Sequence, residues 1–430
     1  MQGYRHCLDM GAELVIASAQ AIDGSFVGDL RLRSSFLLQA QAALKALAEE
    51  VRLPLLLGSY AAAPHCAPAQ PAPFLIAEGQ VHRLDNRCVV QVGDLSIFTD
   101  VGGEEPVAPP PDVHCDCILH LPGGAWHIGQ AQEWAALSAR EAAERHCAVV
   151  IAQGIGCTAG HLHAGGSMYT TPGGEACHHL PLFDAAEATL PMPEQPPCEP
   201  LQAPELSAIL YCLRETMEQG GYHGIAVAAD EANGPLLLAL AQEAVGAEYT
   251  TGMTWEKTPS AFGRSICLPQ LPPACSPALQ QRIRSQVIAD RASEHKLLLL
   301  RSCGRKDMLL GEAQLPADAC GLLAPLGDMY DSMIHRVREA LVARHGAELS
   351  RLLPPPPGMP PEVEHELRML ADEGQSPFEM LLTHGCEDES RLRRMLRRIN
   401  RAAAQPPSAT WILHVHKRSI SLPPFHRLVE

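Results

Sequence analysis

One segment constrains the fold of this chain more than any other: GIAVAADEANGPLLLALAQEAVGAEY, from Gly224 to Tyr249. The small and apolar residues from Ile225 to Ala229 predict a buried strand, and the run from Leu236 to Val245 predicts a helix after a tight polar turn. A strand, a turn and a helix in this order form one unit of a parallel α/β sheet. The unpaired N–H groups at the start of such a helix favour an anion, so the order suggests a nucleotide site.

The residues of the turn argue against that site. The turn reads Asp230, Glu231, Ala232, Asn233, Gly234 and Pro235. Two carboxylates repel a pyrophosphate, at a cost on the order of 1 kcal/mol or more for each close pair of charges. Pro235 suits the first position of a helix, because the N–H that proline lacks would have no partner there. The segment therefore predicts the fold of a nucleotide-binding unit without its phosphate site.

Size, composition and charge limit the classes of function. The chain has 430 residues, of which 46% are hydrophobic and 19% are charged, so it can form two or three domains with buried cores. Its net charge of -16 disfavours nonspecific binding to nucleic acid or to an anionic membrane. No apolar run reaches the roughly 18 residues that span a bilayer, and the first residues lack a signal-peptide pattern. We expect a cytoplasmic protein with neither a nucleic-acid nor a membrane partner.

The cysteines predict no disulfide framework, because the 15 thiols are odd in number and scattered over a long chain. We expect most of them to be reduced. Residue types that bind metals occur in two groups: His114, Cys115, Cys117 and His120, and the pair His161 and His163. Neither group has the CxxC…CxxC or HExxH spacing of a zinc site, so we predict no metal there.

Proline-rich stretches indicate the domain organisation. LPMPEQPPCEPLQAPEL, from Leu190 to Leu206, predicts a linker, because prolines lack the N–H donor and favour extended chain. We place one domain at residues 1–189 and a second at 205–430, joined by a linker at 190–204. VAPPPDV, from Val107 to Val113, is expected to be a loop.

Short apolar runs alternate with helical patterns on both sides of the linker. The first region contains the expected strands ELVIAS, LPLLLGSY, FLIAEG, LSIFTD, CILHLP, AVVIAQ and SMYTT. The expected helices there are FLLQAQAALKALAEEV and the segment from Ala131 to Arg145, and GHLHAGGSMY is expected to hold a turn before its strand. After the linker, the strands IAVAA and LLLLRS alternate with helices, as in a doubly wound parallel sheet. The basic helix RLRRMLRRINR is interpreted as a solvated face, since its apolar residues form one stripe.

Several of these segments resemble one family, the glutamine-dependent NAD⁺ synthetases. ELSAILYCLRETMEQGGYHGIAVAADEANGPLLLALAQEAVGAE resembles the start of their ATP-pyrophosphatase domain, where the turn carries S-G-G-x-D-S. GAELVIASAQAIDGSF and HLPGGAWHIGQAQEW are similar to segments of their nitrilase-like glutaminase domain, in the family order. The resemblance covers roughly residues 5 to 405. It implies an α-β-β-α nitrilase-like sandwich followed by a doubly wound, Rossmann-like ATP-pyrophosphatase domain. It also implies that the chain begins at the family's first helix, so that the strand before it is missing and leaves a sheet edge to be covered or paired.

The resemblance also implies that the glutaminase residues are replaced. Amide hydrolysis in this family needs a cysteine nucleophile, a glutamate base and a lysine near the oxyanion. The glutamate position falls on Ala19, which cannot carry a proton, and the cysteine position falls on Thr99. The lysine position falls near Asn86 or Arg87. We therefore expect no glutaminase activity.

In the second domain, the resemblance implies that most of the positive charge for ATP is lost. The family motif T-G-N-K-S-E corresponds to Ser302, Cys303, Gly304, Arg305, Lys306 and Asp307. Mg²⁺ could bind at Asp307 and at Asp318, which lies in LPADACG. Lysine positions of the family fall near Gly327 and Asp331, and a basic tail motif is reduced to Ala402, Ala403, Ala404 and Gln405.

These replacements predict a degenerate, noncatalytic homologue that acts in scaffolding, partner binding or regulation in NAD biosynthesis. The expected assembly is a homo-oligomer or a complex with an active synthetase, and no cofactor is predicted. One alternative is an active ligase that amidates deamido-NAD with glutamine or ammonia, using ATP and Mg²⁺ held by Asp307 and Asp318. Another is a new small-molecule site near Thr99 and Asp100.

Overall fold

The computed structural model of the chain describes residues 2–19, 21–24, 28–62, 68–188, 190, 203–255, 263–269, 277–311, 321–355, 358–384, 388–403 and 411–417. Two compact units are present. The first comprises Met1–Thr158 and Leu162–Pro200, and the second comprises Ala159–His161 and Leu201–Glu430.

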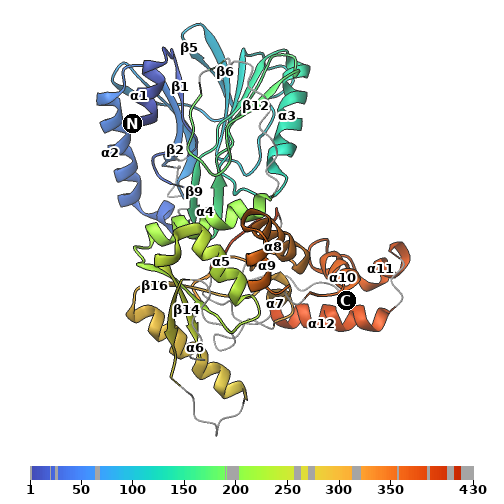
Figure 1. Cartoon of the computed structure of the whole chain (residues 1–430). Helices are drawn as coiled ribbons and strands as arrows, with labels where there is room; N and C mark the ends of the chain where they lie inside the picture. The colour runs from blue at the N-terminus through green and yellow to red at the C-terminus, as the bar shows by residue number, and fades with distance from the viewer. Residues whose placement is uncertain are drawn as a thin grey trace. The chain divides into compact units, whose positions relative to one another are not determined.

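The first unit contains two β-sheets between helices (Figure 1). One sheet has the order β1-β2-β3-β4, with β1 Val15–Ile16, β2 Leu55–Ala61, β3 Gln70–Ala77 and β4 Gln80–Arg83. The other has the order β12-β11-β8-β7-β6-β5, with β5 Cys88–Val92, β6 Leu95–Val101, β7 Cys117–Leu121, β8 Ala148–Ile151, β11 Met168–Thr170 and β12 Cys177–His179. The helices are α1 Gln2–Asp9, α2 Ser34–Glu50 and α3 Gln130–Arg145, with a short 3₁₀ turn, η1, at Gly28–Leu32. This is the expected α-β-β-α arrangement.

Strand alternation produces the three apolar layers of this unit, because successive side chains point to opposite faces of a sheet. Leu55 and Leu57 of β2 pack with Leu44 of α2, whereas Leu56 packs with the inner cluster that contains Ile97 of β6. The third layer lies between the second sheet and α3, where Trp134 packs with Phe98, Ile118 and Val149. The core thus lies on both faces of each sheet.

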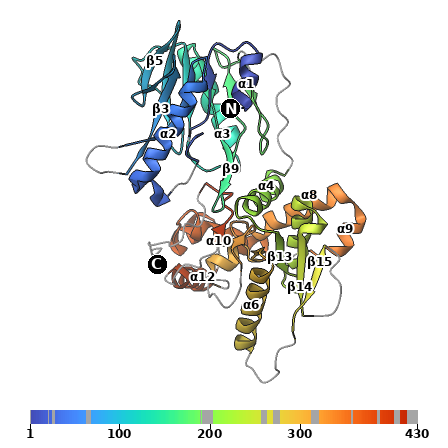
Figure 2. The same cartoon turned by 90° about the vertical axis from the view of Figure 1, so that its left-hand side faces the viewer.

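The second unit is built on one six-stranded parallel sheet with the order β15-β14-β13-β16-β17-β18. Its strands are β13 Gly224–Ala228, β14 Thr250–Thr254, β15 Arg264–Cys267, β16 Leu297–Leu300, β17 Leu323–Ala324 and β18 Trp411–Ile412. Figure 2 shows β13, β14 and β15 side by side. In chain order the strands read 3-2-1-4-5-6, the arrangement of a Rossmann-like doubly wound fold.

The helices of this unit follow the strands as βα alternation requires. They are α4 Pro204–Gln219, α5 Gly234–Val245, α6 Pro277–Glu294, α7 Arg305–Leu309, α8 Asp331–His345, α9 Ala347–Leu352, α10 Pro361–Ala371, α11 Pro377–Thr383 and α12 Glu389–Ala403, with a 3₁₀ turn, η3, at Ala247–Tyr249. Seven residues of α5 are buried, which explains its almost wholly apolar sequence. The apolar stripe of α12 is also buried, through Leu392, Leu396 and Ile399.

Two expectations about local structure were wrong. GHLHAGGSMY holds more than a turn, because β10 His161–Ala164 pairs with β9 Ile155–Thr158 in a separate two-stranded sheet. This error concerns short strands with polar residues, which lack a continuous apolar run. Pro235 is also the second residue of α5, because the helix begins at Gly234.

Candidate functional site in the second unit

The candidate site lies at the carboxyl ends of β13 and β16. These two strands are neighbours, and the chain continues from them toward opposite edges of the sheet. Ligands of doubly wound folds bind at such a switch point. Here the switch point brings together the turn after β13, which carries Asp230 and Glu231, and the segment after β16, which carries Ser302.

Asp230 is hydrogen-bonded to the end of β14. The hydroxyl of Thr254 donates to Asp230 Oδ1 at 3.1 Å, and the N–H of Trp255 donates to Oδ2 at 3.1 Å. Both carboxylate oxygens of Asp230 therefore accept hydrogen bonds from the protein itself.

Glu231 is bound to the other side of the candidate site. The hydroxyl of Ser302 donates to Glu231 Oε2, and the side chain of Asn233 donates to the carbonyl of Ser302 at 2.9 Å. Burial raises the pKa of Glu231, and neither the hydrogen bond from Ser302 nor the nearby Arg301 guanidinium reverses this effect. The turn thus carries a buried carboxyl group that its surroundings only partly stabilise as an anion.

The first residue of α5 packs tightly beneath this turn. A Cβ atom added at Gly234 would lie 2.5 Å from the carbonyl oxygen of Ala228, so only glycine fits there. The N–H of Gly234 donates to the carbonyl of Glu231 at 2.8 Å, and Asn233 makes no side-chain cap. One N–H at the start of the helix is therefore already satisfied by the turn.

The basic residues after β16 also bind internal carboxylates. Arg305 contacts Asp328 and lies 2.6 Å from Asp372, and Lys306 lies 2.8 Å from Asp331. Burial alone would lower the pKa of Arg305, but Asp328 and Asp372 outweigh it and raise the pKa. These cations neutralise the protein's own acids.

Asp328 is a member of this network that the sequence did not reveal. It is fully buried, and its Oδ2 accepts hydrogen bonds from the N–H groups of Val415 and His416 at 2.9 and 3.0 Å. It therefore holds the segment after β18 against the helix that carries Arg305. The one signal in the sequence is an isolated aspartate between apolar residues, in LLAPLGDMY.

Of the two residues at which Mg²⁺ could bind, Asp307 lies in α7, where its carboxylate accepts a hydrogen bond from the N–H of Gly304 at 2.8 Å. Asp318 lies outside the described residues, as do Ala404 and Gln405. In the part of the chain that the structure describes, no three His, Cys, Asp or Glu side chains gather where they could hold a metal ion. Among the same residues, no helix combines the length and the apolar character that crossing a bilayer requires.

The glutaminase positions in the first unit

The structure places two of the glutaminase positions, Ala19 and Asn86, near Val101 of β6. A Cβ atom added at Gly58 would lie 2.8 Å from Ala19 Cα and 2.8 Å from Val101 Cγ1, so Ala19 and Val101 both contact this glycine. Asn86 accepts a hydrogen bond from the N–H of Val101 and donates to its carbonyl, both at 2.9 Å. Ala19 and Asn86 therefore lie on either side of Val101.

None of the side chains at the three glutaminase positions is arranged for amide hydrolysis. Ala19 has no functional group, and both polar atoms of Asn86 bind backbone. Thr99 is fully buried within β6, and its hydroxyl lies 3.4 Å from the carbonyl of Cys88. A buried hydroxyl without a neighbouring base cannot act as a nucleophile.

A buried ionic cluster lies on the other face of β6 and β7, toward α3. His120 Nδ1 lies 3.2 Å from Asp100 and Nε2 lies 2.9 Å from Glu141, and all three side chains are at most 3% exposed. Burial alone would lower the pKa of His120, but the two carboxylates outweigh it and raise the pKa. Arg87 adds a second cation, 3.1 Å from Asp100. Asp100 is thus a structural anion rather than part of a ligand site.

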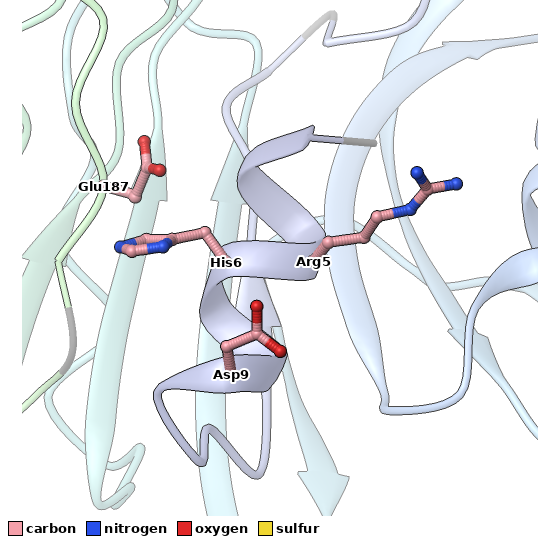
Figure 3. A pocket seen from close by; sticks show the side chains of 4 residues that line it. All are labelled: Arg5, His6, Asp9 and Glu187. Atoms are coloured by element: carbon pink, nitrogen blue, oxygen red, sulfur yellow. The ribbon is translucent and has the colours of Figure 1, made fainter.

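The first unit also contains a cavity of ≈ 830 Å³. Its lining comes from both sheets and includes Ile16, Ile97, Cys117, Val150 and Tyr169. Neither Thr99 nor Asp100 lines it. A separate surface pocket of ≈ 500 Å³ is lined by Arg5, His6, Asp9 and Glu187. In that pocket His6 points toward Glu187 and Arg5 points away from both, so these charges do not converge on one ligand (Figure 3).

Comparison with known proteins supports the fold. No protein-family model matches the sequence, and no curated protein does. Among solved structures, the chain is similar to a glutamine-dependent NAD⁺ synthetase from Cytophaga hutchinsonii, with a TM-score of 0.76, 12% identity, and coverage of 97% of this chain and 91% of that one. It is also similar to a glutamine-dependent NAD⁺ synthetase from Acinetobacter baumannii in complex with ADP, with a TM-score of 0.66, 16% identity, and coverage of 98% and 93%. At these identities the likeness establishes the fold, and the fold expected from the sequence is confirmed.

Proposed function

We propose that this chain acts without catalysis, as a scaffolding, partner-binding or regulatory protein built on the fold of the glutamine-dependent NAD⁺ synthetases. The observation that carries the proposal is the occupation of the switch point by Asp230 and Glu231. Both carboxylates are bound by groups of the same unit, from Thr254 and Trp255 on one side and Ser302 on the other. A triphosphate would have to displace these hydrogen bonds and then face two negative charges.

The surrounding charges support the same proposal. The electrostatic stabilisation that phosphoryl and adenylyl transfer needs comes from cations aimed at the phosphates. Arg305 and Lys306, which follow Ser302, instead pair with Asp328, Asp372 and Asp331. The nearby Arg301 guanidinium faces the charge of Glu231. In the first unit, the positions that correspond to the base and the nucleophile are Ala19 and a buried Thr99. The proposed role in NAD biosynthesis rests on this fold. We propose that the chain forms a homo-oligomer or a complex with an active synthetase.

The test is a calorimetric titration of the full chain with ATP and Mg²⁺, run beside an assay of NAD formation from deamido-NAD with ammonia or glutamine. We expect no binding heat, no rise in melting temperature and no product. Any ligand that binds the native state raises its stability by mass action, so the melting temperature is a sensitive second measure. Conversion of deamido-NAD at an enzyme-like rate would overturn the proposal in favour of the ligase, in which ATP and Mg²⁺ bind near Asp307 and Asp318.

A second candidate function rests on the cavity of ≈ 830 Å³ in the first unit. Its volume is within the range of about 300–1,000 Å³ that small-molecule sites occupy. Apolar side chains from both sheets line it, together with Glu13, Asp116, Asp184 and Glu187. The expected ligand is a small molecule with an apolar body and a polar or cationic group. Native mass spectrometry of the purified chain tests this, because a retained ligand adds mass. The variant Val150→Trp should displace it, whereas Val89→Trp on the exposed part of β5 should not.

A further inference from the structure

Two cysteines lie together where β7 and β8 begin. Cys115 precedes β7 by two residues, and Cys147 immediately precedes β8. The two strands are parallel neighbours, with Cys117 opposite Ala148, and the N–H of Ala148 donates to the carbonyl of Asp116 at 3.2 Å. Cys147 belongs to the apolar cluster that contains Phe98, Ile118 and Trp134, and Cys115 packs against the same cluster. Both cysteines are free thiols.

Arg145 holds the two segments that carry these cysteines. Its guanidinium donates to the carbonyls of Pro109, Pro110 and Val113, at 2.5, 3.1 and 3.3 Å. The loop before Cys115 is thereby fixed to the end of α3, two residues before Cys147. Disulfides form only where the two cysteines are already close, since the bond tolerates little change in backbone geometry. The Arg145 contacts provide that closeness in the reduced protein.

The two thiols differ in burial and in acidity. Cys115 is partly exposed, whereas Cys147 is 3% exposed. The hydrogen bond from Cys147, aided by Arg145, lowers the pKa of Cys115 to about 7, and the same contact raises the pKa of Cys147. A thiolate that solvent can reach reacts first with an oxidant, and a neighbouring thiol then completes the disulfide.

We propose that Cys115 and Cys147 are a redox pair that forms a reversible intramolecular disulfide when the protein meets a hydroperoxide. The Cys115 thiolate attacks one peroxide oxygen and displaces hydroxide, or alkoxide from an organic peroxide, which leaves a sulfenic acid. The Cys147 thiol then attacks that sulfur, and the hydroxyl group leaves as water. Overall, the two thiols lose two electrons, which reduce the O–O bond of the peroxide. A dithiol reductant converts the disulfide back to two thiols.

The disulfide would connect the loop before β7 covalently to the end of α3. In the reduced protein that connection rests on noncovalent contacts, among them the Arg145 hydrogen bonds and the hydrogen bond from Ala148 to Asp116. The pair is independent of the switch point and of the proposed function, so its test does not depend on a ligand of the second unit.

The experiment treats the full chain with a small excess of hydrogen peroxide, blocks the remaining thiols, and maps peptides without reduction. We expect a linked pair of peptides that contain Cys115 and Cys147 and that lack two hydrogens, and we expect a dithiol to separate them. Under the same conditions Cys147→Ser should accumulate a sulfenic acid at Cys115 that dimedone traps. Cys88→Ser, at an exposed thiol, should form the disulfide as the unaltered chain does.

Alkylation provides a second measurement that does not depend on disulfide formation. The rate at which iodoacetamide modifies Cys115 should rise with a midpoint near pH 7, and in Cys147→Ala, which removes the neighbouring donor, that midpoint should move to higher pH. Circular dichroism confirms that each variant is folded. The proposal is overturned if peroxide leaves Cys115 and Cys147 separately alkylatable while other thiols are oxidised, or if Cys115 links to Cys117 instead.

Discussion

Ser302 donates its hydroxyl to Glu231 across the two central strands of the second unit. The serine follows β16 and the glutamate follows β13, so one hydrogen bond joins the two sides of the switch point at which a Rossmann-like fold binds its ligand. The same glutamate has a raised pKa because it is buried. A protein group therefore occupies the position that an anion would need, and its charge destabilises the folded state at neutral pH.

Replacing Glu231 with glutamine should make the second unit more stable near neutral pH. The raised pKa of Glu231 favours the folded state while the group is protonated, and this contribution is lost as pH rises from the ordinary glutamate value through the raised one. Glutamine carries no charge, so we expect a gain on the order of 1 kcal/mol near pH 7 that shrinks toward pH 4. Urea unfolding over this pH range measures it. Glu248→Gln, at an exposed position, serves as control and should show no such trend.

Replacing His120 with phenylalanine should destabilise the first unit strongly. Asp100 and Glu141, each 3% exposed, would lose their shared cation, which costs roughly 3–5 kcal/mol for a buried pair. Because the pKa of His120 is raised, its charged form contributes fully below its ordinary value, and the contribution is lost as pH rises through the raised value. The difference between the two proteins in urea unfolding should therefore decrease above neutral pH. The control is His82→Phe, since His82 is exposed on β4. If this variant loses as much unfolding free energy as His120→Phe, the charge cluster is not the cause.

Replacing Arg305 with methionine should release the segment after β18. Asp328 is fully buried and would lose its guanidinium partner while keeping its bonds to Val415 and His416, so we expect a loss of about 3 kcal/mol. Arg305→Lys should lose less, since it keeps the charge, but one ammonium cannot bridge Asp328 and Asp372 as a guanidinium does. Hydrogen exchange at the Val415 amide reports the effect directly. The control is Arg393→Met, which breaks a half-exposed ion pair with Glu389 and should change hydrogen exchange at Val415 little. If the Val415 amide is as well protected in Arg305→Met as in the unaltered chain, the prediction is wrong.

Replacing Gly58 with alanine should disturb the packing around Ala19 and Val101. The new Cβ would lie 2.8 Å from both Ala19 and Val101, and overpacking of this kind costs about 1–3 kcal/mol. Gly156→Ala is the matched control, because a Cβ at that strand position meets nothing within 4 Å. Thermal unfolding compares them. Equal melting temperatures would mean that the first unit relaxes around Gly58 at no cost.

The fold could be predicted from the sequence because its strongest strands are short apolar runs between turn residues. LLLL at β16 and GIAVA at β13 are buried on both faces, as central parallel strands require. Two strands that were missed, β4 and β9, have exposed residues and no apolar run, so pairing with a neighbour rather than their own sequence makes them strands. The buried strand β14 was missed because its sequence, TTGMT, has no apolar run either.

Only those residues of the candidate site that are neighbours in the sequence could be predicted. Asp230 and Glu231 are adjacent in sequence, so their place after a strand was readable. Their partners Thr254 and Ser302 come from two other strands, and nothing in the local pattern pairs them. Glu141 and His120 are a similar case, since a glutamate on a helix and a histidine in a strand each look ordinary until the fold brings them together.

The strand order of the second unit has a consequence for synthesis on the ribosome. Gly224 of β13 pairs with Leu297 of β16, which the ribosome adds much later, after β14, β15 and α6. A nascent chain that ends before β16 exposes one edge of its most apolar strand, and such edges recruit other strands. Once β16 has been made and has paired, that edge of β13 is covered, and the exposed edge passes to β16 until β17 follows.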